Sequence, residues 1–180
     1  MVDPDERLAW LRSLRATRWV REVPVSAALV GELLDVARWT GSARNRQPWR
    51  VVVVTDPTMR ARLAELGAYA GHLAGAPVVV LLAVDLDGGG EDAELDAGRF
   101  AQTFTLAAHA RGLGTCPASF FPADNARGAT RLAGLADPWR VRTAISLGYP
   151  APSPHPGAAS AVPRGRMALD ALRSTAPPIP

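Results

Sequence analysis

Ser42, Asn45 and Gln47 are the residues whose types and spacing most clearly suggest ligand binding. They stand in the stretch Ser42–Val54, SARNRQPWRVVVV, where a polar loop runs through a Pro-Trp pair into a run of valines. The valines are apolar enough to predict a buried strand. A rigid strand would fix the loop, so that its hydroxyl and amide groups can hydrogen-bond a planar ligand at the mouth of the core.

Arginines that recur every three residues form a second candidate site, for an anion. Arg12, Arg15, Arg18 and Arg21 would make one basic ridge if this stretch were helical. A solvated helix face explains such a ridge without any ligand. Thr17 and Arg18, at the end of the expected helix, could instead hold an anion.

Catalysis by side chains and metal binding have little support in the sequence. His72, His109 and His155 are scattered, with no cysteine or carboxylate at the spacing of a zinc site. Cys116 has no obvious base, so a buried structural thiol is the simpler interpretation. Ser119 lies in no Gly-x-Ser-x-Gly motif, and no Gly-x-Gly-x-x-Gly follows a predicted strand. We therefore expect no metal, and arginines must hold the phosphate of any nucleotide cofactor.

Composition sets the class of protein. The 180 residues are 48% hydrophobic and 21% charged, which is ordinary for one globular domain over residues 1–180. The net charge is only +3 and no basic face with interleaved aromatics is visible, so we expect no nucleic-acid partner. No apolar run approaches the roughly 20 residues of a membrane span, and the acidic amino terminus is unlike a signal peptide. The lone cysteine fits a reducing compartment, and we expect a cytoplasmic protein without a membrane partner.

Six helices and three strands must position these residues. Helical periodicity predicts helices over about 5–15, 27–40, 57–66, 91–111, 123–134 and 167–172. Apolar runs and alternation predict strands over 50–55, 77–85 and 140–148. We expect irregular segments at 85–92, a mobile loop, at 113–121, at the proline-rich connector 150–163 and at the tail 174–180. The elements do not alternate regularly between strand and helix, which favours the α+β class.

The order of several motifs resembles the flavin-dependent nitroreductase family, from about Arg15 to Arg166. These motifs are, in order, RATRWVREVPV, ARWTGSARNRQPWRVVVV, APVVVLLAV, AAHARGLGTCPASF, SLGYP and PRGR. The resemblance implies an intertwined homodimer, with a central, mostly antiparallel sheet flanked by helices and FMN at the interface. It also implies an enzyme, an FMN-dependent oxidoreductase that takes hydride from NADH or NADPH and reduces a small acceptor, a nitroaromatic or a quinone, by a ping-pong mechanism.

The resemblance further implies which residues contact the cofactor. Basic motifs near the two ends of the chain would hold the phosphate and ribityl chain, through Arg15, Thr17, Arg18, Arg164 and Arg166. The polar loop, contributed by the partner subunit as often as by the same one, would contact the ring through Ser42, Asn45 and Gln47. A later segment would lie against the flavin edge, chiefly through backbone groups, at Pro117, Ala118 and Ser119. Arg60 matches a cation directed at the pyrimidine end of the ring, where it would stabilise reduced flavin. The flavin carries the chemistry, so no catalytic side chain is expected.

Two departures from the family pattern keep other functions open. The first phosphate motif, Arg-x-Ser-x-Arg in many members, has Leu14 and Ala16 in place of its first arginine and its serine, so Arg15 would substitute from the neighbouring position. The chain also has little room for a substrate-covering excursion between its third and fourth helices. The alternatives are a flavin-binding or flavin-sequestering protein without reductase turnover, a specialised biosynthetic flavin oxidase or dehydrogenase, and a member that uses a deazaflavin.

Overall fold

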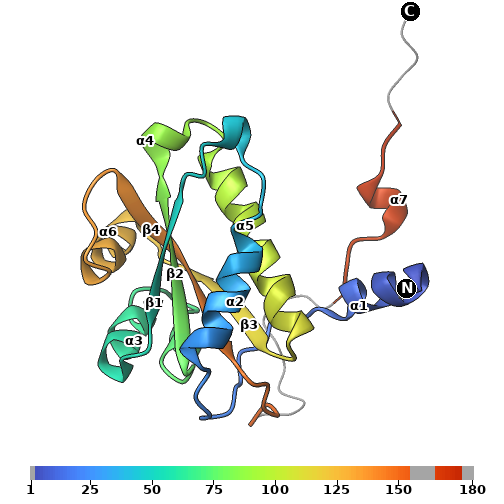
Figure 1. Cartoon of the computed structure of the whole chain (residues 1–180), viewed down its shortest axis with the longest axis horizontal. Helices are drawn as coiled ribbons and strands as arrows, with labels where there is room; N and C mark the ends of the chain where they lie inside the picture. Colours follow the sequence, from blue (N-terminus) through green and yellow to red (C-terminus); the bar gives the residue numbers. More distant parts are fainter. Residues whose placement is uncertain (1–2, 155–164, 176–180) are drawn as a thin grey trace, which may run out of the picture.

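A four-stranded sheet forms the centre of the molecule (Figure 1). The computed structural model describes residues 3–154 and 165–175. Its strands are β1 (Trp49–Val54), β2 (Val78–Asp85), β3 (Gly114–Ser119) and β4 (Trp139–Gly148), in the spatial order β1-β2-β4-β3. Every neighbouring pair is antiparallel. The α+β class and the antiparallel sheet that we expected are therefore confirmed.

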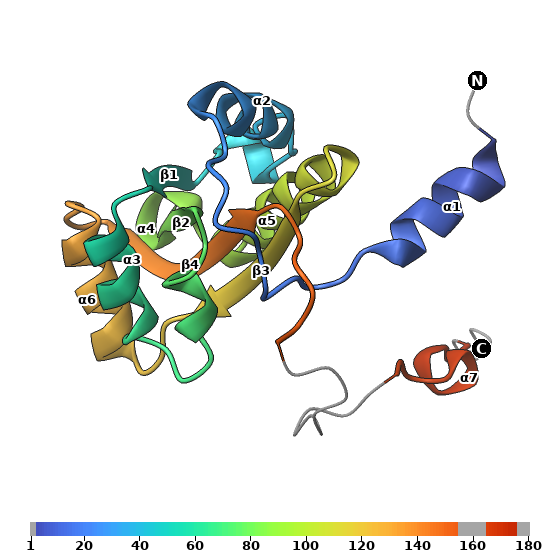
Figure 2. The ribbon, with the colours of Figure 1, turned by 90° about the horizontal axis from the view of Figure 1, so that it is seen from below.

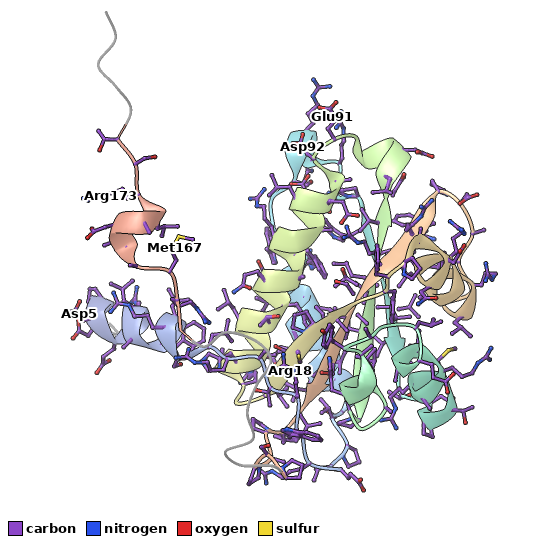
Figure 3. The ribbon with its side chains drawn as sticks, turned by 180° about the vertical axis from the view of Figure 1, so that it is seen from behind. Asp5, Arg18, Glu91, Asp92, Met167 and Arg173 are labelled. Carbon is purple, nitrogen blue, oxygen red and sulfur yellow. The ribbon has the colours of Figure 1, made fainter. Side chains whose placement is uncertain are left out.

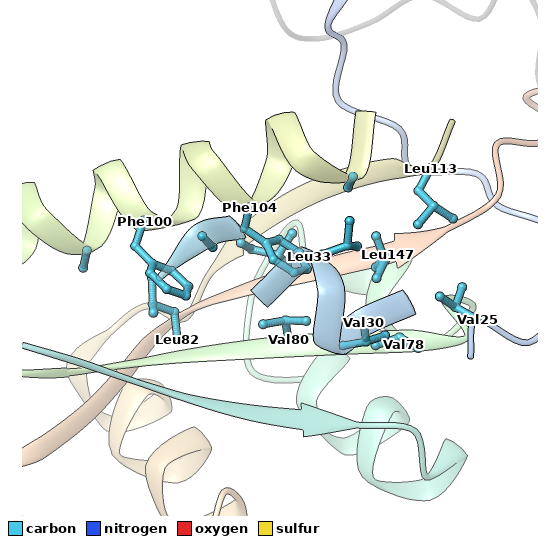
Figure 4. Close-up of a cluster of buried hydrophobic side chains, with 14 of the residues drawn as sticks. Val25, Val30, Leu33, Val78, Val80, Leu82, Phe100, Phe104, Leu113 and Leu147 are labelled. Carbon is cyan, nitrogen blue, oxygen red and sulfur yellow. The ribbon is translucent and has the colours of Figure 1, made fainter. Parts of the chain in front are cut away.

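Helices cover both faces of this sheet (Figure 1). One face carries α2 (Ala27–Ala37) and α5 (Ala93–Ala110), and the other carries α3 (Pro57–Ala64), the short η2 (Gly71–Leu73) and α6 (Ala123–Leu132). Side chains alternate along a strand, so β2 contributes Val80 to the first core and Leu81 to the second. Figure 4 shows Phe100 and Phe104 of α5 packed toward β2 in the first core.

Two helices stand away from the sheet. α1 (Pro4–Ser13) and α7 (Leu169–Leu172) project from the same side of the molecule, and neither contains a buried residue (Figure 2). Their exposed apolar side chains include Leu8 at 49% and Leu11 at 45% in α1, and Met167 at 68%, next to α7. A single chain therefore leaves apolar surface uncovered on both arms. Within the described residues no helix is long and apolar enough to cross a bilayer.

The segment 113–121, expected to be irregular, contains a fourth strand. β3 pairs with β4 from Gly114 to Ser119, and these long-range hydrogen bonds override the local preference of a Gly- and Pro-rich stretch. Pro117 is compatible with a strand here because β3 is at the edge of the sheet, where one side of the backbone needs no partner strand.

Helix ends also differ from the sequence prediction. α1 ends at Ser13, so Arg15, Arg18 and Arg21 follow it in an irregular segment and do not share one face of a helix. The segment 85–92 includes a helical turn, α4 (Leu86–Gly89), because the Asp85 carboxylate accepts the Gly88 N–H at 2.7 Å. The remaining expected helices are present with ends shifted by a few residues. Most of the connector 150–163 and of the tail 174–180 lies outside the described residues.

Candidate functional site

The polar loop, residues 42–47, is closed by two hydrogen bonds. The Ser42 hydroxyl accepts the Gln47 N–H at 2.9 Å, so the two ends of the loop meet. The carboxylate of Asp96, in α5, accepts the Ala43 N–H at 2.8 Å. Because Asp96 is only 2% exposed, this anchor is part of the core. The chain thus holds the loop in a defined shape by its own contacts.

Backbone strain marks the same loop. Arg44, Asn45 and Gln47 have φ of 53°, 55° and 51°, in the left-handed region that residues other than glycine rarely adopt. Each such residue costs on the order of 1 to 3 kcal/mol, and such conformations cluster at ligand sites. The Gln47 amide donates to the side-chain oxygen of Asn45 at 3.2 Å, and both side chains are exposed. The amides therefore stand at the surface, within reach of a ligand.

The basic segment, residues 15–18, lies along the edge strand β3. The Thr17 N–H donates to the Thr115 carbonyl at 2.7 Å, and Ala16 forms an isolated bridge to the same residue. Gly114 allows this approach, since a Cβ on it would lie 2.5 Å from the Thr17 side chain. Ala16, which stands where the resemblance implies a serine, is therefore held through its backbone.

Arg15 and Arg18 carry the positive charges of the basic segment. Arg15 donates to two backbone carbonyls at the end of α1, at 2.6 and 2.8 Å. Arg18 (labelled in Figure 3) lies near enough to His72 and Cys116 to influence both pKa values. No ion pair among the described residues includes either arginine. Both can therefore attract an anion.

The flavin-edge segment predicted from the sequence presents two side chains outward. Pro117 and Ser119 are exposed, whereas Ala118 is 7% exposed and packs into the core with α3 and α6. Strand alternation explains this difference. A ligand beside β3 would meet Pro117 and Ser119 directly, and Ala118 only through its backbone.

His72 and Ser146 form a polar contact beside this segment that we did not predict. The Ser146 hydroxyl donates to the Cys116 carbonyl at 3.3 Å, and the His72 Nδ1 is 2.9 Å from the same hydroxyl. With its hydrogen used in that way, the hydroxyl accepts from a protonated Nδ1. Burial, and secondly the charge of Arg18, lower the pKa of His72, while burial raises the pKa of the Cys116 thiol against a smaller opposing effect of Arg18. Both groups are therefore held in their neutral forms.

Arg60 is engaged by its own chain. Its guanidinium donates to the backbone carbonyls of Ala74, at 3.3 Å, and Ala76. It also lines a cavity of about 420 Å³ together with Glu22 and Thr55. These contacts join α3 to the segment just before β2, and the predicted role of Arg60 at a flavin ring stays a prediction.

The carboxyl-terminal arginines are only half described. Arg166 is exposed and donates to the carbonyl of Gly165 at 2.8 Å. Arg164 lies outside the described residues. The convergence of this pair on the basic segment stays a prediction. No three His, Cys, Asp or Glu side chains gather into a metal site in the part of the chain that is described.

One chain keeps the polar loop and the basic segment apart, at opposite ends of α5. Asp96, near the start of α5, anchors the loop, whereas His109, near its end, stacks on Trp10 and bonds Ser13 at 2.9 Å just before the basic segment. With a rise of 1.5 Å per residue, the two positions on α5 are about 20 Å apart. Of the predicted site residues, the structure therefore places Thr17, Arg18 and the residues of β3 together, and Ser42, Asn45 and Gln47 in a separate group.

The chain belongs to the nitroreductase family, because the family model matches residues 11–68 and 64–149. An NADH dehydrogenase of Thermus thermophilus is 42% identical over 73 residues, which cover 41% of this chain and 36% of that protein. A protein of Methanothermobacter thermautotrophicus, provisionally named an NADH dehydrogenase/NAD(P)H nitroreductase, is 29% identical over 147 residues, or 80% of this chain and 77% of that one. The crystal structure of a provisionally named nitroreductase from Desulfovibrio desulfuricans, in complex with FMN, superposes with a TM-score of 0.78 at 27% identity. This superposition covers 98% of this chain and 99% of the Desulfovibrio desulfuricans chain.

Proposed function

We propose that this protein is an FMN-dependent oxidoreductase that takes hydride from NADH or NADPH and reduces a small acceptor, a nitroaromatic or a quinone, by a ping-pong mechanism in the cytoplasm. The observation that carries the proposal is the extent of the family match, which includes the basic segment, the polar loop and residues 117–119. A solved relative that aligns over 98% of this chain holds FMN.

The basic segment fits a phosphate. Arg15 and Arg18 have no carboxylate partner among the described residues, and the backbone of Thr17 fixes their position on β3. Guanidinium groups can bond two phosphate oxygens while neutralising their charge. In the proposal Arg164 and Arg166 complete this phosphate site.

The polar loop and β3 fit a planar, hydrogen-bonding ring. Ser42, Asn45 and Gln47 offer hydroxyl and amide groups on a fixed backbone, and Pro117 and Ser119 offer an exposed strand edge. Bound FMN would supply the redox chemistry, by accepting hydride and passing it on. The chain would supply orientation and electrostatics, with the cations of the basic segment held beside β3.

In the proposal, a second copy of the chain brings the two groups together. The loop and the end of α1 contact α5 at Asp96 and His109, about 20 Å apart along the helix, so we infer that one flavin is not held by both groups of a single chain. In a two-fold dimer the loop of one subunit can face the basic segment of the other. The apolar side chains exposed on α1 and near α7, such as Leu8, Leu11 and Met167, are the kind of surface that such a partner covers.

Flavin binding and turnover test the proposal directly. We expect the purified protein to be yellow, or to quench FMN fluorescence on titration, and to oxidise NADH or NADPH steadily when a nitroaromatic or a quinone is added. Colourless protein that does not quench FMN fluorescence would show the proposal to be wrong.

One alternative is favoured by the altered first phosphate motif. Leu14 and Ala16 provide neither a guanidinium nor a hydroxyl, which suits a protein that binds or sequesters flavin without turnover. That alternative predicts bound FMN with negligible oxidation of NADH or NADPH. The same assay therefore separates the two functions.

A further inference from the structure

Asp96 is the only charged side chain among the buried residues that the structure describes, with 2% exposure. Burying a carboxylate is costly unless hydrogen bonds and opposite charge compensate. Asp96 has one partner of each kind, the Ala43 N–H at 2.8 Å and the Arg99 guanidinium at 3.4 Å. Its strongest contact is therefore made to the polar loop and not within its own helix.

The neighbouring turns of α5 contact the residues that lead into the same loop. Thr40 donates to the Thr103 hydroxyl at 2.9 Å. A Cβ on Gly41 would lie 3.2 Å from the Arg99 side chain, so the two residues pack closely. One face of α5 thus contacts the chain from residue 40 to residue 43, immediately before the strained part of the loop.

Backbone strain shows why an anchor is needed there. Arg44, Asn45 and Gln47 occupy the left-handed region, and nothing in their side chains favours it except for Asn45. A strained backbone persists only where its surroundings over-determine it. Ala43, whose N–H Asp96 accepts, directly precedes Arg44.

We infer that Asp96 is a positioning residue, whose carboxylate fixes the polar loop in the shape that contacts a bound flavin ring. The positioning of the loop follows from the contacts of the chain alone. Only the link to the ring rests on the proposed function, so the two parts have separate tests.

Tryptic cleavage tests the positioning without any ligand. Arg44 and Arg46 are cleavage sites inside the loop. In Asp96→Ala we expect the initial rate of cleavage after these two residues to rise by about tenfold or more, since the Ala43 N–H loses its acceptor and the loop its anchor. Asp96→Asn should cleave like the wild type, because its amide oxygen can still accept the Ala43 N–H. If Asp96→Ala does not fold, Asp96→Ser, whose shorter side chain does not reach Ala43, takes its place.

Thr130→Val is the matched control. Thr130 is buried far from the loop in sequence and accepts the Val141 N–H at 2.9 Å, so its loss also leaves a buried backbone N–H without a partner. We expect it to lower the melting temperature without raising the rate of cleavage after Arg44 and Arg46. Equal cleavage rates in wild type and in the folded Ala or Ser variant of Asp96 would overturn the inference.

Ligand affinity tests the link to the ring. Asp96→Ala should weaken binding of FMN and of riboflavin by a similar factor, about tenfold, because both share the ring but only FMN carries the phosphate. Asp96→Asn should restore both affinities to within about threefold. Unchanged riboflavin affinity would overturn this part. Wild-type protein that binds no flavin would instead overturn the proposed function, and the cleavage experiment would still decide the positioning role.

Discussion

The His72 Nδ1 lies 2.9 Å from the Ser146 hydroxyl, which joins the turn before β2 to the end of β4. The hydroxyl bonds the Cys116 carbonyl at the same time, so the contact links three segments next to the strand edge that we assign to the flavin. A neutral imidazole with its hydrogen on Nδ1 satisfies all of these groups. Protonation of the second ring nitrogen would place a positive charge beside Arg18.

The unfolding free energy should therefore depend on pH through His72. Its folded pKa is lowered from 6.5 by burial and by Arg18, so the unfolded chain binds the proton more readily. The neutral form should support full stability above about pH 7, and stability should fall as the pH drops below 6.5 toward the folded pKa. Urea unfolding from pH 8 to pH 5 measures this. His72→Asn, whose amide can still donate to Ser146, should reduce the slope, and an unchanged slope would refute the assignment.

Gly114→Ala should displace the basic segment. The new Cβ would lie 2.5 Å from the Thr17 side chain, so one of the two backbones must move. We expect a loss of about 1 to 3 kcal/mol in unfolding free energy and weaker FMN binding. Gly31→Ala in α2 is the control, since no atom beyond its chain neighbours and its own helix backbone would lie within 4 Å of the new Cβ, and a helix interior favours alanine by about 0.5 to 1 kcal/mol. Denaturant titration of both variants measures these changes. Equal losses of unfolding free energy in the two variants would argue against a specific clash at Gly114.

Thr130→Val should destabilise the protein without affecting the site. Its hydroxyl donates to the Ala126 carbonyl at 2.8 Å and accepts the Val141 N–H, all within the core. A buried N–H left without a partner costs about 1 to 3 kcal/mol. Thermal unfolding should show the loss, while FMN titration of the folded variant should match the wild type. Weaker FMN binding by the folded variant would contradict this prediction, because it would mean that packing around α6 affects the FMN site.

Arg15→Ala with Arg18→Ala should discriminate between the phosphate and the ring. Charge-assisted bonds to a phosphate are worth about 1.5 to 3 kcal/mol each, so losing two of them should lower FMN affinity by about a hundredfold or more. Riboflavin, which lacks the phosphate, should bind these variants nearly as it binds the wild type. Arg164→Ala with Arg166→Ala should give the same pattern. Fluorescence titration with both ligands checks the prediction, and equal losses for the two ligands would show that the phosphate site lies elsewhere.

The sequence predicted the elements whose own residues determine them. The valines of β1 and β2 and the repeated apolar face of α5 are local signals, and these elements form as expected. β3 was missed because Gly114 and Pro117 disfavour a strand locally, and only pairing with β4 stabilises it. The arginines from Arg15 to Arg21 form no helical ridge, since α1 ends at Ser13 and arginine spacing alone does not extend a helix.

The residues that position the site were harder to find than those predicted to bind. His72 depends on Ser146, a partner distant in the sequence, so no local pattern reveals it. Asp96 did carry a signal, because it lies four residues before Phe100 and therefore on the same face of a helix. A carboxylate on a core face requires a partner, which the structure shows to be the backbone of the polar loop.

Complementation between two defective chains tests the central claim, that each flavin lies between two copies of this protein. One chain carries Arg15→Ala and Arg18→Ala, the other carries Asn45→Ala and Gln47→Ala, and distinct tags allow the mixed dimer to be purified. If the basic segment and the polar loop meet across the interface, each mixed dimer should regain about one tight FMN site, while both parent proteins bind weakly. A mixed dimer that binds FMN no better than its parents would contradict the account.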